Sequence, residues 1–169
     1  MAKNTKTERI LAILHLFRRC REVSFKEVTD LIPVSKKTVY RDIRFLREAG
    51  FCISYARTSG AFVMCPDKEP ALLPENKTRR RYMERVLRLA EMMSGMGRAD
   101  DPAAWYREKY PNLSTRTRQR DFKILCSIGY RVEYVRGSDD WADREPRKYY
   151  CEWPADTYDS DIFDLFRRP

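Results

Sequence analysis

Two segments of the chain carry basic, hydroxyl and amide side chains whose spacing places them on one side of a helix. In the first segment these residues are Lys36, Lys37, Tyr40, Arg41, Arg44 and Arg47. Thr38 in the same segment and Arg57 just after it are also candidate DNA-binding residues. In the second they are Thr115, Arg116, Gln119, Arg120 and Lys123. Arginine and lysine can bind O6 and N7 of guanine, glutamine can bind N6 and N7 of adenine, and a threonine methyl can contact the methyl of thymine. These residue types therefore indicate readout of base edges from a helix in the major groove of duplex DNA.

The two segments are copies of one sequence pattern. Residues 34–57 align with residues 113–136 at a constant offset (114 − 35 = 79) and without a gap. The identical positions in the first copy are Ser35, Thr38, Arg41, Asp42, Leu46, Gly50, Tyr55 and Arg57. From the serine to the last arginine, each copy has six basic and two acidic residues. An internal repeat of this length indicates a duplicated structural unit, and the positive charge belongs to what is repeated.

Each copy predicts a helix followed by a β-hairpin. Ser35 and Ser114 stand where an N-cap belongs, and Gly50 and Gly129 suit the left-handed residue that ends a helix. Alternating apolar and aromatic residues then predict the hairpin strands. These strands are expected at residues 51–55 and 61–64 in the first copy, and at 130–136 and 147–153 in the second, where residues 138–145 form an acidic tip.

A helical wheel separates an apolar inner face from the cationic outer face in both predicted helices. The inner residues are Val39, Ile43, Phe45, Leu46 and Ala49 in the first, and Phe122, Ile124, Leu125 and Ile128 in the second. Asp42 and Asp121 also fall on the inner side. Because a buried carboxylate needs a partner, we interpret both as internal structural contacts and not as catalytic acids.

Helices are also predicted before each copy. Apolar residues between Ile10 and Phe17 have helical spacing, and a capping box from Ser24 to Glu27 opens a short helix that ends before Pro33. In the second half, residues 84–87 resemble residues 8–11, and Asp101 followed by proline begins another helix. Both halves therefore have the order helix, helix, helix, hairpin, which is the order of a winged helix.

The predicted fold class is mainly α with small β-hairpins (α+β), arranged as two tandem winged helix-turn-helix domains. The first domain covers residues 1–65 and the second covers residues 77–154. Residues 66–76, with three prolines, are predicted to be a short, stiff linker. Residues 155–169 form an acidic C-terminal segment with a short helix at 160–166.

Composition and charge narrow the class of protein. A net charge of +9 favours a polyanionic partner, and no apolar run approaches a membrane span, so we expect a cytoplasmic, nucleoid-associated protein. The five cysteines are scattered and form no zinc or redox motif. The single histidine, His15, lies within an apolar helical segment and is not expected to act as a base. We predict no enzyme activity, no metal and no cofactor.

The pattern Ser35-x-x-Thr38-Val39-x-Arg41-Asp42-Ile43-x-x-Leu46-x-x-x-Gly50 resembles the DeoR-like winged-helix regulators, including the N-terminal domains of WYL-domain regulators. The resemblance covers roughly residues 7–65. It implies a bacterial or phage transcription factor, often a repressor, whose third helix enters the major groove. By that resemblance Lys37, Thr38, Tyr40, Arg41 and Arg44 face the DNA.

Two departures from the resemblance leave alternatives open. Such regulators usually carry a sensor domain, whereas here the chain continues into a second copy, so we expect no small-molecule effector. The second copy also has Arg118 where the first has Val39. The expected partner is double-stranded DNA, with a homodimer as an option. The alternatives are a replication initiator of a plasmid or phage, and a winged-helix adaptor that binds protein.

Overall fold

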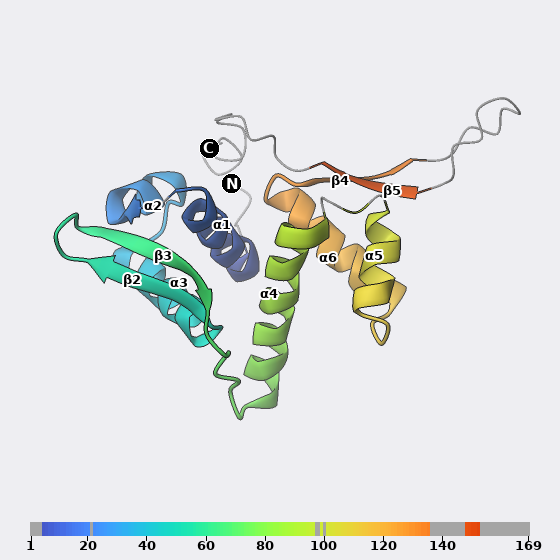
Figure 1. Cartoon of the computed structure of the whole chain (residues 1–169), viewed down its shortest axis with the longest axis horizontal. Coiled ribbons are helices and arrows are strands. Elements are labelled where there is room, and N and C mark those ends of the chain that lie inside the picture. Colours follow the sequence, from blue (N-terminus) through green and yellow to red (C-terminus); the bar gives the residue numbers. More distant parts are fainter. Residues whose placement is uncertain (1–4, 21, 97–98, 100, 136–147, 153–169) are drawn as a thin grey trace, which may run out of the picture. The chain divides into compact units, whose positions relative to one another are not determined.

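A computed structural model of the chain describes residues 5–20, 22–96, 99, 101–135 and 148–152, and these residues form a mixed α and β structure (Figure 1). The chain divides into two compact units, the first reaching to Arg88 and the second beginning at Leu89. The predicted acidic hairpin tip and the predicted C-terminal helix lie outside the described residues.

Three helices open the first unit: α1 (Lys6–Arg19), α2 (Phe25–Leu31) and α3 (Lys36–Glu48). The capping box predicted before α2 is present, since the Ser24 side chain accepts the Glu27 amide and the Glu27 carboxylate accepts the Ser24 amide. A second capping box, between Thr5 and Glu8, begins α1. Each box satisfies two backbone amides that the helix itself leaves without partners.

An antiparallel sheet of three strands completes this part of the unit, in the order β1 (Glu22–Ser24), β3 (Ala61–Lys68) and β2 (Phe51–Ala56). The turn between β2 and β3 is closed by a 2.9 Å hydrogen bond from the Gly60 amide to the carbonyl oxygen of Ala56. The sequence predicted the hairpin but not β1, whose three residues are too few to show an alternating pattern. Three helices with this small sheet agree with a winged helix.

The core of the first unit lies between the helices and the sheet. It consists of apolar side chains from every element, including Ile10, Leu14, Val28, Val39, Leu46, Phe51 and Phe62. In Figure 1 the hairpin of β2 and β3 runs beside α3. The sheet therefore supports the helix that carries the first group of predicted DNA-binding residues.

The segment after β3 is hydrogen-bonded to the first unit. β3 continues to Lys68, which pairs with Phe51, so the strand extends three residues beyond the predicted domain end at 65. The amide of Glu69 donates to the carbonyl of Gly50 (2.9 Å), and the amide of Leu72 donates to the carbonyl of Glu48 (2.8 Å). The first part of the predicted linker is therefore not a free spacer.

Helix α4 (Lys77–Gly95) follows this segment, and its first half belongs to the first unit. The ring of Tyr82 lies 5.3 Å from that of Phe45 on α3, measured between centroids. The guanidinium of Arg79 pairs with Glu48 at 2.6 Å, and the Lys6 ammonium lies over the rings of both Phe45 and Tyr82. The C-terminal end of α3 is thus held by α4 as well as by the sheet.

The second unit contains α5 (Pro102–Lys109), α6 (Thr115–Ser127) and a two-stranded antiparallel sheet of β4 (Arg131–Val135) and β5 (Lys148–Glu152). As predicted, Asp101 caps α5 with proline at the first helical position. The core includes Leu89, Met92, Met93, Met96, Tyr106, Phe122, Leu125, Ile128 and Tyr130. Within the ranges described above, no helix is long and apolar enough to cross a membrane.

Candidate nucleic-acid interface

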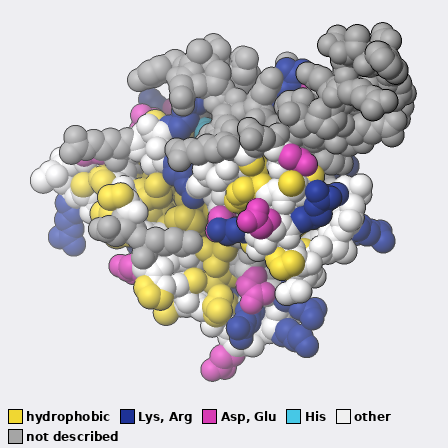
Figure 2. Space-filling view, turned by 45° about the vertical axis from the view of Figure 1, so that its right-hand side comes forward, with side chains coloured by type: hydrophobic (Ala, Val, Ile, Leu, Met, Phe, Trp, Pro, Cys, Tyr) yellow, Lys and Arg dark blue, Asp and Glu magenta, His cyan; other side chains and the backbone are white. Residues whose placement is uncertain are grey.

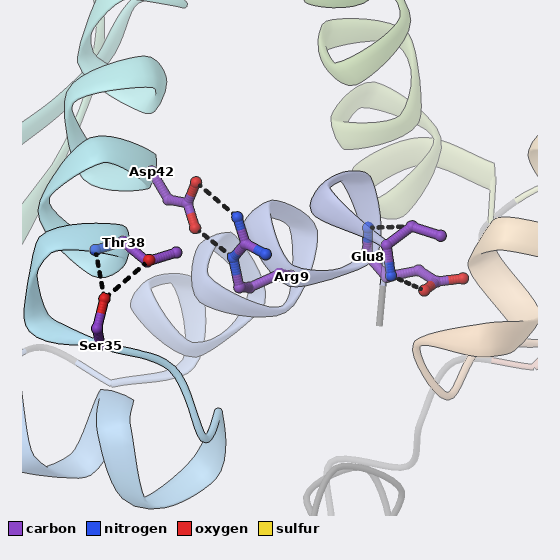
Figure 3. Close-up of polar contacts among 6 residues, drawn as sticks. Glu8, Arg9, Ser35, Thr38 and Asp42 are labelled. Carbon is purple, nitrogen blue, oxygen red and sulfur yellow. Dashed lines mark hydrogen bonds and ion pairs between the residues drawn. The ribbon is translucent and has the colours of Figure 1, made fainter. Parts of the chain in front are cut away.

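The first turns of α3 and α6 are fixed in the same way. The Ser35 hydroxyl accepts the Thr38 amide at 3.4 Å and lies 3.0 Å from the Thr38 hydroxyl (Figure 3). In the second copy, Ser114 and Thr117 repeat this arrangement at 3.3 and 3.0 Å. The identical serine and threonine in the two sequence copies therefore serve as N-caps, as predicted.

The two helices also end alike. Gly50 has φ +88° and Gly129 has φ +97°, in the left-handed region where a side chain is strained. At Gly50 a Cβ atom would lie 2.2 Å from the carbonyl oxygen of Glu69, so glycine is required there by close packing as well as by conformation. The glycine end of each helix directs the chain into its hairpin.

The two inward carboxylates connect each helix to its neighbour. Asp42 is fully buried and accepts two hydrogen bonds from the Arg9 guanidinium, at 2.5 Å from Nε and 3.2 Å from Nη2 (Figure 3). Asp121 is fully buried and accepts a 2.8 Å hydrogen bond from the Tyr106 hydroxyl. Their prediction as internal structural contacts is confirmed. The pair with Arg9 sets the rotation of α3 on α1, because the two bonds fix both groups in one plane.

The outer face of α3 is open to solvent. Lys36, Lys37, Tyr40, Arg41 and Arg44 are exposed, and Arg44 shows 82% of its side chain. Thr38 is half-buried because its hydroxyl lies in the N-cap, and Arg57 is exposed in the turn between β2 and β3. The five apolar residues predicted for the inner face of α3 are all buried.

Two charged residues at the C-terminal end of α3 have intramolecular partners. Arg47 is exposed overall, yet its Nε donates a 2.7 Å hydrogen bond to the carbonyl of Ile53 on β2. Glu48 accepts from Arg44 at 3.2 Å and from Arg79 at 2.6 Å. The side chains nearer the N-terminal end of α3 are therefore the better placed to contact a ligand.

The outer face of α6 is exposed in the same pattern. Its solvent-facing side chains are Thr115, Arg116, Gln119, Arg120 and Lys123. On the inner side Phe122, Leu125 and Ile128 are buried, but Ile124, predicted to be inside, is only half-buried. Arg118 is half-buried where the corresponding Val39 is completely buried. The second copy therefore keeps the cationic face and has a less complete apolar one.

The lysine and arginine side chains do not form one continuous positive surface. In the face drawn in Figure 2, lysine and arginine side chains form several separate clusters with acidic side chains beside some of them. The three consecutive arginines at the start of α4 illustrate this, because Arg79 pairs with Glu48 and Arg80 pairs with Glu84 at 3.2 Å. Positive charge alone does not identify a DNA-binding surface. The candidate surface is therefore defined by the exposed side chains of α3 and α6.

The histidine and the cysteines are the remaining candidates for other chemistry. Burial, and then the charges of Arg19 and Arg18, lower the pKa of His15 to about 4, so the imidazole is neutral at neutral pH. Across the described ranges no three histidine, cysteine or acidic side chains are grouped as a metal site. Three of the cysteines, Cys20, Cys65 and Cys126, are free thiols.

The sequence did not reveal the aromatic residues that support Tyr40. Its ring stacks on Phe25 of α2, with centroids 5.6 Å apart and an angle of 21°, and it meets Phe62 of β3 edge-on at 6.1 Å. The three rings come from three different elements. No periodic spacing along the chain relates them, so only the tertiary structure brings them together.

Residues 9–65 match a family model described as the DeoR-like helix-turn-helix domain. The match covers 57 of the 169 residues and includes all of α2, α3 and β2 (65 − 9 + 1 = 57). The second copy lies outside it. No curated protein and no solved structure shows a significant match to the chain.

Proposed function

Because residues 9–65 form a DeoR-like helix-turn-helix DNA-binding domain, we propose that the chain is a sequence-specific transcription regulator that binds double-stranded DNA. In this proposal α3 lies in the major groove, where Lys37, Arg41 and Arg44 reach base edges and flanking phosphates. The observation that carries the proposal is the exposed cationic face of α3, opposite a face that is completely buried.

The attachment of α3 supports this role. A reading helix must present its side chains in one orientation, since a displacement of about 1 Å disturbs bidentate contacts. Here the N-cap at Ser35, the pair between Asp42 and Arg9, and the contacts of Glu48 hold the helix at its start, middle and end. None of these contacts uses Lys37 or Arg41.

We extend the proposal to the second unit, as a second winged helix. Its support is the repeated order of helices and hairpin, the repeated N-cap and C-terminal glycine, and the repeated buried aspartate. In this proposal Arg116, Gln119 and Arg120 of α6 bind DNA too. Repression is the regulatory mode we favour, because it requires only that the bound protein occupy the site. In this proposal the chain has no enzymatic activity of its own.

Selection of bound duplexes from a random DNA pool, with the full chain, tests the proposal. We expect enrichment of one motif, with two half-sites if both units read sequence. Affinity for the enriched duplex should fall steeply as salt rises, because phosphate contacts release counterions. Absence of an enriched motif, together with salt-independent affinity, would overturn the proposal in favour of a protein-binding adaptor.

Single substitutions test the assignment of the two helices. Arg41→Ala should lower affinity for the enriched duplex by about 5- to 100-fold, the usual cost of one lost base contact. Arg120→Ala should lower it as well, through the half-site bound by α6. Arg107→Ala is the matched control, since this exposed arginine lies in the last turn of α5, outside both cationic faces. Unchanged affinity in both test variants would show that the helices are wrongly assigned.

A further inference from the structure

Two exposed tyrosines of the first unit lie against one buried ring. Tyr40 and Tyr55 expose 54% and 50% of their surfaces, although they are large, partly apolar residues. Both rings contact Phe62, which is only 2% exposed, with centroids 6.1 Å and 5.2 Å from it respectively. We call Tyr40 and Tyr55 the tyrosine pair.

The strand register explains why Tyr55 belongs to this pair. Tyr55 is directly opposite Phe62 in the pairing of β2 with β3, and opposite residues point to the same face of an antiparallel sheet. That face also carries the buried Ile53, which lies two residues before Tyr55 on β2. Tyr55 is near the end of β2, so its ring extends past the core while staying on the side of α3.

The hydroxyl end of Tyr55 is near the turn of the hairpin. A Cβ atom added to Gly60 would have the Tyr55 hydroxyl oxygen as its nearest neighbour, at 3.8 Å. The same turn carries the exposed Arg57. Next to Tyr40, the Lys36 ammonium lies 5.2 Å from the ring of Phe25, on which Tyr40 stacks. Cationic residues therefore occur in the two elements next to the pair, the start of α3 and the hairpin turn.

Such residues fit an interface with a polar, anionic partner. Tyrosine combines an apolar ring with a hydroxyl donor and loses little conformational freedom on binding, particularly when its ring is already packed. A phenol can donate to a phosphate oxygen, a contact that fixes register without reading sequence.

We propose that Tyr55, which the sequence did not indicate, is a DNA-contacting residue whose hydroxyl donates to a backbone phosphate beside the groove that α3 occupies. Through Phe62 it joins the hairpin and α3 into one contact surface. This inference rests on the proposed function, and it adds a residue on a strand to a site otherwise assigned to helices and the turn.

Tyr55→Phe in the full chain is the test, because it removes the hydroxyl and keeps the ring on Phe62. We expect a roughly ten- to hundredfold loss of affinity for the enriched duplex, the usual effect of one hydrogen bond to a charged group. Affinity for unrelated duplexes should fall by the same factor. The salt dependence should stay as in the unaltered protein, since a neutral donor displaces no counterion. Ethylation of individual phosphates should weaken binding of the unaltered protein at one particular phosphate. Ethylation of that same phosphate should not weaken binding of the Tyr55→Phe variant.

Tyr110→Phe is the matched control. It removes a hydroxyl that donates to Glu91 in the second unit, and it should leave affinity unchanged. If Tyr55→Phe binds like the unaltered protein while Arg41→Ala is weakened, the inference is overturned and the proposed function stands. If the unaltered protein itself shows no salt-dependent affinity for duplex DNA, both are overturned.

Discussion

Acidification should destabilise the protein by charging its only histidine, His15. This residue lies in α1 among buried apolar side chains and is itself only 8% exposed. Burial is the largest cause of its lowered pKa, and the nearby cations Arg19 and Arg18 add to it. In the unfolded chain the burial is lost and water screens the two arginines, so the imidazole there has a pKa near its ordinary value of 6.5.

The sign and size of the effect of pH on stability follow from the difference between the folded and unfolded pKa values of His15. A folded-state pKa below the unfolded one means that the unfolded chain binds the proton more readily. The contribution of His15 to stability is therefore fully present above pH 6.5, declines as the pH falls, and is lost below about pH 4. The interval from 6.5 to about 4 corresponds to about 3 kcal/mol, at roughly 1.4 kcal/mol per pKa unit. Between pH 7 and pH 5 the expected loss is about 2 kcal/mol.

Two measurements check this. Because the chain has one histidine, its imidazole C2 proton gives one NMR resonance, and the midpoint of its titration should lie near pH 4. Urea denaturation at pH 7 and pH 5 should show that His15→Gln loses about 2 kcal/mol less stability than the unaltered protein. Carboxylates titrate in both proteins, so their effect cancels in the comparison.

The reasoning would be refuted by an NMR midpoint at or above pH 6 in the folded protein. It would equally be refuted if His15→Gln and the unaltered protein lost the same free energy of unfolding between pH 7 and pH 5. Either result would mean that the site is more open to water than its position in α1 indicates.

Three further changes should alter the free energy of unfolding, measured by urea denaturation. Gly50→Ala should cost more than about 2 kcal/mol, because a Cβ would collide with a main-chain carbonyl, whereas Gly60→Ala, left-handed but with its nearest neighbour at an ordinary contact distance, should cost about 1 kcal/mol. Asp42→Asn should cost roughly 3 kcal/mol by leaving the Arg9 guanidinium without its charged partner, and a cost below about 1 kcal/mol would contradict the role given to the pair. Ser35→Ala should cost about 1 kcal/mol through the lost N-cap, and an unchanged stability would show that the cap is dispensable.

Local signals in the sequence were sufficient for the helices and hairpins. Serine caps, terminal glycines and apolar periodicity act within a few residues, so they predict α3, α6 and the second hairpin closely. In the first hairpin, β3 extends four residues beyond its predicted end at 64. The inward aspartates were also predictable, because the helical period alone places them. Their partners, Arg9 and Tyr106, were not, since each comes from a separate helix and no spacing rule connects it to the aspartate.

Dependence on contacts between separate elements also explains which features of the candidate site were not predicted from the sequence. The exposed faces of α3 and α6 follow from one helical wheel each and were predicted residue by residue. The contribution of β2 depends on register and on the side chain of Phe62, which is known only once β2 pairs with β3. The short strand β1 and the attachment of residues 69–72 to the first unit likewise depend on pairing with distant parts of the chain.

Because α4 is attached to α3, the first compact unit and the segment that matches the family model end at different residues. Sequence similarity ends at residue 65, inside β3, while the contacts of Phe45 and Glu48 extend to Tyr82 and Arg79. A fragment cut at the limit of similarity would truncate a strand and uncover the ring of Phe45. The segment that packs as one compact unit is thus longer than the segment that matches the family model.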